Sequence, residues 1–157
     1  MALEYRSTEV FLRPDVRYRS ILVSKFINNL MRKGKKSVAE KVFYQAMDLL
    51  RSRFADKEPL EIVETAIKNV KPMVEVKSKR VGGATYQVPV EVSRKRQLSL
   101  AIRWILSAVK NKKGKPTYQK LADELSDAYK RQGVAITQRE NTHKMAEANK
   151  AFAHFAW

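Results

Sequence analysis

The chain has 157 residues, which suits one domain with a substantial core, and its 32 Lys and Arg residues face only 16 Asp and Glu residues. The net charge of +16 exceeds what solubility requires and predicts an anionic partner, either a nucleic acid or an acidic membrane surface. The lack of cysteine excludes disulfides and thiolate metal sites, and no apolar run approaches the length of a spanning helix. We therefore expect no metal and no cofactor.

Residues 1–19 are predicted to form an irregular, basic N-terminal extension without the apolar core of a secretory signal. Its arginines alternate with Tyr5, Phe11 and Tyr18 and are Arg6, Arg13, Arg17 and Arg19. This interleaving is typical of RNA contacts, because aromatic rings and guanidinium planes stack on unpaired bases. The alternative is an ordinary frayed terminus.

Two helices are predicted next, separated by a basic turn. Ser20 is a candidate N-cap of the first helix and Gly34 a candidate C′ residue after it. Ser37-x-x-Glu40 has the spacing of a capping box at the start of the second helix. The turn between them carries Arg32, Lys33, Lys35 and Lys36. Such a cluster is usually solvated charge, but beside other basic segments we interpret it as a phosphate-binding turn.

A third helix is predicted to begin at Pro59, a favourable first helical residue, and to stop before Pro72. Its polar face is acidic and includes Glu61 and Glu64. Paired carboxylates can act as a general acid and base. On a hydrated helix face, however, we interpret these two as surface charge.

The segment after this helix reads KPMVEVKSKRVGGATYQVPVEVSRKR and predicts a β-ribbon over residues 72–92. Two alternating runs flank a Val-Gly-Gly-Ala turn, which is the pattern of a β-hairpin. We expect no other strand pair, and an isolated two-stranded hairpin is marginal in water. The ribbon must therefore pack on helices at its base or be ordered by a partner.

The ribbon and the helix start behind it are strongly basic. The predicted contact residues in this stretch are Lys71, Lys77, Lys79, Arg80, Gly82, Gly83, Tyr86, Arg94, Lys95 and Arg96. Cations at 94–96 occupy the first turn of a helix and oppose its dipole, so a folding argument alone favours Asp or Glu there. A polyanion docked at that turn reverses the sign of the effect. The alternative is a solvated charged arm.

Three further helices are predicted after the ribbon. The first runs from Ser93 to about Lys110 and the second begins at Thr117. The last has capping-box spacing at Thr137-x-x-Glu140, although a start a few residues earlier also fits. A second basic loop lies between the first two and contains Lys110, Lys112, Lys113 and Lys115. The C-terminal AFAHFAW indicates either a local core flap or a docking surface.

The predicted fold class is mainly α: one RNA-binding domain, residues 1–157, of six helices with a protruding two-stranded β-hairpin between helices 3 and 4. The positive clusters fall on turns and on the hairpin, whereas helices 3 and 5 are acidic or balanced. No P-loop, metal cluster or nucleophile motif is present, so we expect a structural role and no enzyme activity.

Three stretches resemble a known family. They are VGGATYQVPVEV in the hairpin, ILVSKFINNLMRKGKKSVAEKVFYQA near the start and THKMAEANKAFAHFAW at the end. On these, the chain is identified as a member of the bacterial small-subunit ribosomal protein seven family. The resemblance implies a cytoplasmic, structural constituent of the small ribosomal subunit, which binds rRNA early and organises its 3′ major (head) domain.

The resemblance also implies neighbours. The ribbon and the C-terminal helix are expected near the exit site for mRNA and E-site tRNA. Other head proteins and platform protein eleven are the expected protein partners.

Two other classes of protein remain open, a DNA-bending architectural protein and a nucleic-acid enzyme, and turnover with magnesium tests for the enzyme. A DNA-bending architectural protein also uses basic β-ribbon arms, and here Val81 is the candidate wedge at the tip. Competition between duplex DNA and ribosomal RNA separates the two. A membrane-surface role is disfavoured, because the positive charge is concentrated in loops and not along one amphipathic face.

Overall fold

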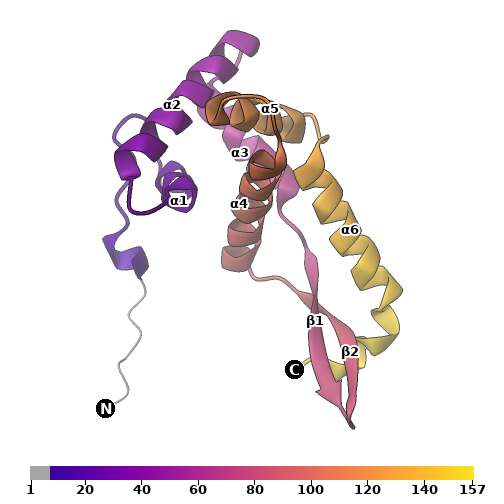
Figure 1. Cartoon of the computed structure of the whole chain (residues 1–157). Helices are drawn as coiled ribbons and strands as arrows, with labels where there is room; N and C mark the ends of the chain where they lie inside the picture. The colour runs from indigo at the N-terminus through magenta and orange to yellow at the C-terminus, as the bar shows by residue number, and fades with distance from the viewer. Residues whose placement is uncertain (1–7) are drawn as a thin grey trace, which may run out of the picture.

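The computed structural model describes residues 8–157, so the predicted contact Arg6 lies outside the described residues. The described chain runs η1 (Thr8–Phe11), α1 (Ile21–Leu30), α2 (Lys36–Arg53), α3 (Pro59–Val70), β1 (Val74–Val81), β2 (Ala84–Glu91), α4 (Arg94–Asn111), α5 (Thr117–Tyr129), α6 (Val134–Ala148) and η2 (Lys150–Phe155). This confirms the predicted fold class, with two short 3₁₀ helices added. Figure 1 shows the helices gathered in one body, from which the ribbon and the lower half of α6 extend together.

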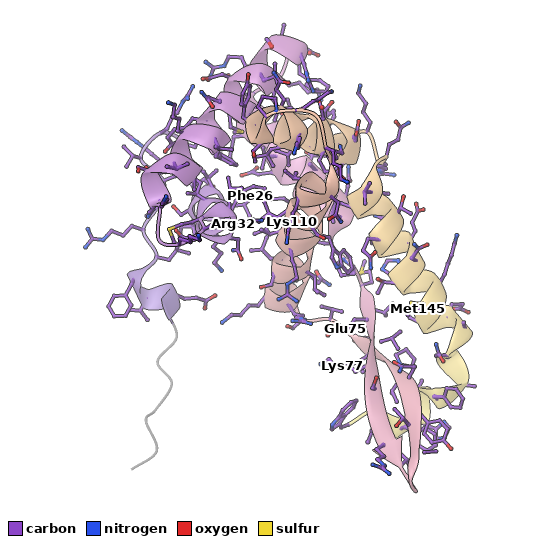
Figure 2. The ribbon with its side chains drawn as sticks, in the orientation of Figure 1. Phe26, Arg32, Glu75, Lys77, Lys110 and Met145 are labelled. Carbon is purple, nitrogen blue, oxygen red and sulfur yellow. The ribbon has the colours of Figure 1, made fainter. Side chains whose placement is uncertain are left out.

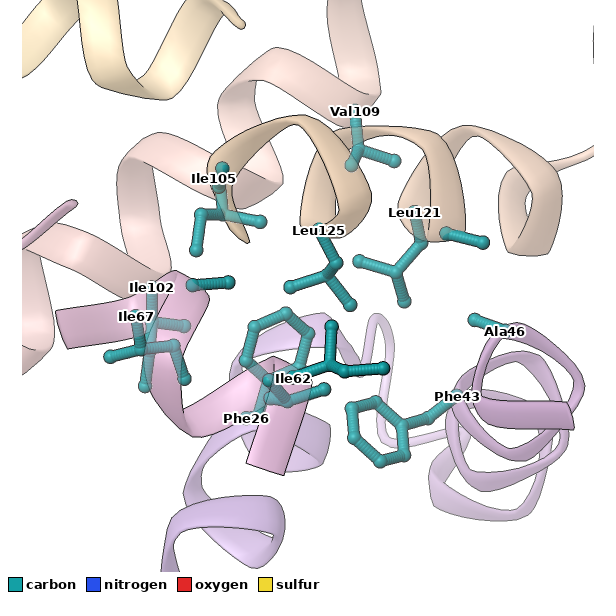
Figure 3. Close-up of a cluster of buried hydrophobic side chains, with 14 of the residues drawn as sticks. Phe26, Phe43, Ala46, Ile62, Ile67, Ile102, Ile105, Val109, Leu121 and Leu125 are labelled. Atoms are coloured by element: carbon teal, nitrogen blue, oxygen red, sulfur yellow. The ribbon is translucent and has the colours of Figure 1, made fainter. Parts of the chain in front are cut away.

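The core lies where α1 to α5 meet, and each helix contributes one apolar stripe. Phe26 of α1 and Phe43 of α2 are fully buried, with ring centroids 5.4 Å apart. Leu121 and Leu125 of α5 point toward Ile62 of α3 across the same space (Figure 3). Full burial of each such side chain contributes about 1.5–3 kcal/mol, so these contacts fix the relative positions of the helices.

The start of α1 agrees with its sequence prediction, and its end does not. Ser20 caps the helix as expected, since its hydroxyl oxygen accepts a hydrogen bond from the Val23 N–H at 3.5 Å. The helix nevertheless ends at Leu30, so the prediction of Gly34 as its C′ residue is wrong. Lys33 and Gly34, with φ of 51° and 71°, instead form the turn itself.

Neither predicted capping box forms, although the alternative start of the last helix, a few residues before Thr137, is confirmed. Helix α2 begins at Lys36, so Ser37 lies inside the helix and its side chain caps nothing. Helix α6 begins at Val134, where the buried Glu124 of α5 accepts a hydrogen bond from the Ala135 N–H at 3.0 Å. Because this capping residue belongs to a neighbouring helix, no local sequence pattern marks the start of α6.

The ribbon has the predicted turn. Gly82 and Gly83 have φ of 57° and 84°, which fits the mirror-image turn that matches the twist of a two-residue hairpin. The register places Lys77 opposite Val88 and Glu75 opposite Val90, so charged side chains of β1 share a face with valines of β2. That mixed face is the one that contains the buried Val88 and Glu75.

Support for the ribbon comes from the end of the chain. Helix α6 packs along β1 and η2 packs on β2. Tyr86 packs against two rings of the C-terminal segment, with its centroid 5.1 Å from that of Phe152 and 5.0 Å from that of Phe155. Of the two alternatives for AFAHFAW, the structure shows packing within the chain, against the ribbon.

Candidate nucleic-acid interface

The described part of the N-terminal extension is held against the helices. The buried Asp15 carboxylate accepts hydrogen bonds from the Arg17 and Tyr18 N–H groups at 3.0 and 2.9 Å and from the Tyr44 hydroxyl at 2.6 Å. Burial and this hydrogen bond raise the pKa of Tyr44. The Ser24 hydroxyl donates to the Arg13 carbonyl at 2.6 Å. The extension is therefore a positioned segment between residues 13 and 18, not a frayed terminus.

The predicted arginines of this segment differ in their availability. Arg17 forms an ion pair with Asp48, and its guanidinium lies 5.3 Å from the ring centroid of Tyr44. The hydrogen bond to Asp48 raises the pKa of Arg17. Arg13 and Arg19 are exposed and form no ion pair with any residue in the described chain. They are free to contact a partner.

A hollow lies between two basic segments, the α1–α2 turn and the α4–α5 loop. It encloses about 400 Å³, and its cationic lining residues are Arg32, Lys35, Lys110 and Lys120. Figure 2 shows Arg32 and Lys110 close together although they are far apart in the sequence. None of the four is ion-paired within residues 8–157. The structure thus brings the α1–α2 turn and the α4–α5 loop to one site, and it adds Lys120, which the sequence reading missed.

The remaining cations of the α1–α2 turn lie beside this hollow. Lys33 is exposed on the turn itself. Lys36 lines a second hollow of about 330 Å³ together with Arg13 of the N-terminal extension. The N-terminal segment and the turn therefore form adjoining parts of one basic surface.

Half of the cationic side chains predicted to bind RNA in the α4–α5 loop form ion pairs with acidic side chains of the chain itself. Lys112 lies 2.8 Å from the fully buried Glu124 carboxylate, which also caps α6. Lys115 lies 3.0 Å from Asp123. Partial burial opposes ionisation of Asp123, but hydrogen bonds from Arg53 and Lys115 outweigh it and lower its pKa. Within the described residues, only Lys110 and Lys113 of the four predicted cations form no ion pair.

The excess of positive charge at the start of α4 is smaller than its sequence indicates. Lys95 lies 3.0 Å from Glu9 of η1, and Arg96 lies 3.2 Å from the buried Glu75 of β1. Hydrogen bonds from Lys95 and Lys25 lower the pKa of Glu9. Two of the three dipole-opposing cations thus have partners inside the chain. Arg94 is exposed and has no ion pair among residues 8–157.

The ribbon also divides into occupied and open residues. Lys77 lies 3.5 Å from Glu75, and the Lys79 ammonium donates to the Phe155 carbonyl at 2.6 Å and lies 4.8 Å from the Trp157 ring centroid. Tyr86 is covered by the C-terminal rings described above. The open positions are Arg80 and the turn residues Gly82 and Gly83, all exposed, with Lys71 half-buried at the base.

One histidine fixes the base of the ribbon to α6. The Met73 N–H donates to His143 Nε2 at 3.1 Å. Burial and the nearby Arg139 lower the pKa of His143, which favours the neutral ring that this hydrogen bond requires. His143 therefore has a positioning role between two elements, and its surroundings give no sign of catalysis.

The described chain contains no arrangement typical of metal binding. Among residues 8–157, no three His, Asp or Glu side chains are grouped to hold a metal ion. In the same residues, no helix has the length and apolarity needed to cross a membrane.

The fold and its unpaired cations define a class: helical proteins with a β-ribbon arm whose basic surface suits a polyanion. The family model for ribosomal protein S7p/S5e matches residues 3–150, and the chain belongs to this family. The family consists of ribosomal proteins and not of enzymes, which confirms the predicted family and the predicted lack of enzyme activity.

Individual relatives match along almost their whole length. The chain is 59% identical to small ribosomal subunit protein uS7 of Rhodopirellula baltica over 144 residues, which cover 91% of this chain and 92% of the relative. It is 56% identical to the protein of the same name from Desulfotalea psychrophila, with 92% of each chain covered. The corresponding protein of Syntrophobacter fumaroxidans is 54% identical over 147 residues, 94% of each chain.

Proposed function

We propose that the chain is a structural constituent of the small ribosomal subunit that binds ribosomal RNA through its unpaired cations. The observation that carries this proposal is their distribution. Among the predicted contact residues, the cations that no acidic side chain or carbonyl group occupies fall on the N-terminal segment, the α1–α2 turn, the α4 start, the α4–α5 loop and the ribbon. They are Arg13, Arg19, Arg32, Lys33, Lys35, Lys36, Lys71, Arg80, Arg94, Lys110 and Lys113, and Lys120 of α5 joins them at the hollow. Turns and an arm of this kind suit phosphate contacts at a junction of RNA helices.

The proposed target is the 3′ major domain of the small-subunit RNA, which becomes the head. There the protein holds RNA helices in place for proteins that bind later. The ribbon and α6 face the path of mRNA and E-site tRNA, and other head proteins and platform protein eleven are neighbours. Family membership supports this finer assignment, and the location on cytoplasmic ribosomes follows from it.

No observation favours the DNA-bending alternative. Its candidate wedge, Val81, is partly buried and is paired with Ala84 directly beside the turn. An intercalating side chain must project from the tip.

The salt dependence of binding tests the role of the unpaired cations. We expect the triple variant Arg32→Gln, Lys35→Gln and Lys110→Gln to flatten the log–log slope of RNA affinity against salt by roughly two to three units, at about 0.7–0.9 per lost phosphate contact. The measurement is filter binding to small-subunit RNA at several salt concentrations.

A matched variant controls for net charge alone. Arg51 and Lys150 are exposed and Lys57 is partly exposed. The three already face Glu58, Glu147 and Glu61, at 3.8, 3.7 and 4.0 Å respectively. Replacing these three with Gln removes the same charge and is expected to leave the slope nearly unchanged. Equal slopes for the two triple variants would show that the unpaired cations have no special role.

A further inference from the structure

The hollow between the α1–α2 turn and the α4–α5 loop is lined by two kinds of side chain, cationic and apolar. Its cations, defined above, are Arg32, Lys35, Lys110 and Lys120, and no acidic side chain lines it. Its apolar lining consists of Leu30, Val38, Ala39, Val42, Leu106 and Val109. We call this site the basic groove. Binding of phosphate groups would use the cations of the groove but not its apolar lining residues.

We propose that the basic groove binds one unpaired nucleotide extruded from the RNA, with its base on the apolar lining and its phosphates on the four cations. The inference rests on the proposed RNA-binding function and goes beyond it by naming the ligand of this groove. The faces of an unstacked base are apolar and its edges are polar, whereas a duplex offers a protein mainly phosphates and groove edges.

The size and polar groups of the groove fit this ligand. A volume of about 400 Å³ lies in the range of sites for small organic ligands. The Asn29 amide nitrogen donates to the Lys25 carbonyl at 2.7 Å, which leaves its side-chain oxygen open to a base edge. The Thr117 hydroxyl is a second polar group in the lining.

The chain allows the groove to be blocked at a chosen position. It contains no cysteine, so a single introduced thiol is unique. Val38 lines the groove and is 55% exposed, so Val38→Cys is expected to fold normally. Val134, at the start of α6, is 54% exposed and lies outside the groove, so Val134→Cys is the matched control. N-cyclohexylmaleimide adds bulk to either thiol without charge or an aromatic ring.

Binding and base protection are then measured with small-subunit ribosomal RNA and dimethyl sulfate. We expect unmodified Val38→Cys to protect at least one unpaired base, and the alkylated protein to lose that protection and to bind at least about fivefold more weakly, the low end of one base contact. Alkylated Val134→Cys is expected to behave like the wild-type chain.

Three results overturn the inference in different ways. If alkylated Val38→Cys binds within twofold and protects the same bases, no nucleotide enters the basic groove. If it binds RNA normally but no longer joins purified small-subunit proteins, the groove holds an acidic protein segment instead. If the unmodified wild-type chain does not bind the RNA at all, the proposed function itself fails.

Discussion

At the scale of single residues, the buried Glu75 shows why charge cannot be interpreted from sequence alone. Its side chain is 12% exposed, and it lies 3.2 Å from Arg96 and 3.5 Å from Lys77. A carboxylate in such a place is stable only while its cationic partners are present. Arg96 therefore stabilises the base of the ribbon, whereas the exposed Arg94 in the same helical turn has no such role.

This difference predicts the effect of two similar substitutions. We expect Arg96→Gln to lower the free energy of unfolding by about 1–2 kcal/mol, because Glu75 then keeps only Lys77. Arg94→Gln is expected to change it by less than about 0.5 kcal/mol, as for most surface positions. Urea denaturation followed by circular dichroism measures both values. Equal stability of the two variants would contradict the assignment.

The basic clusters are visible in the sequence, but the sequence does not show which of their cations form ion pairs within the chain. The acidic partner of Lys95 is Glu9, 86 positions away, and that of Arg96 is Glu75, 21 positions away. Such pairs depend on where η1 and the ribbon lie relative to the start of α4, which no local pattern encodes. Lys112 is a similar case, because the sequence of α5 gives no sign that its partner Glu124 is buried beside the start of α6.

At the scale of elements, two contacts hold the ribbon against α6 and η2. The first is the hydrogen bond from the Met73 N–H to His143, and the second is the contact of Tyr86 with Phe152 and Phe155. Aromatic pairs contribute about 0.5–1.5 kcal/mol each beyond their buried area. The end of the chain thus supplies the support that an isolated hairpin lacks.

The hydrogen bond from the Met73 N–H to His143 is expected to depend on pH. The pKa of His143 is lowered in the folded protein, so its contribution to stability is present above the unfolded value near 6.5 and is lost as pH falls through the folded value. Exchange of the Met73 amide, corrected for intrinsic rate, should therefore accelerate between pH 7.5 and about pH 5. Nuclear magnetic resonance measures it residue by residue.

The two histidines of the chain allow a control for this measurement. His143→Leu removes the acceptor, so fast exchange of Met73 should become independent of pH, whereas His154→Leu should keep the wild-type response. An identical pH response in the wild type and in His143→Leu would show that another group titrates.

The elements themselves and the starts of α1, α3, α4 and α5 were predictable, whereas the starts of α2 and α6 were not. The apolar spacing of each helix and the Gly82-Gly83 turn are local signals, so six helices and one ribbon follow from the sequence. The start of α6 depends on Glu124, a residue of another helix, and the start of α2 depends on the turn at Lys33 and Gly34. The support of the ribbon by the C-terminal segment likewise requires knowing where α6 leads.

At the scale of the whole molecule, the fold separates two tasks. The helices form one core whose exposed turns meet around the basic groove, and the ribbon with α6 extends away from that body (Figure 1). We therefore expect a partner RNA to contact two separated places, the groove side of the body and the arm. Contacts of this kind favour a folded RNA with several helices over a single uniform duplex.

Footprinting of the free chain on complete small-subunit ribosomal RNA, with hydroxyl radicals and with excess duplex DNA as competitor, tests the central claim most directly. We predict protections confined to the 3′ major domain that persist in the presence of the DNA, because shape and unpaired bases contribute to recognition besides phosphate charge. Protections scattered over the whole RNA, or erased by the DNA, would contradict the account.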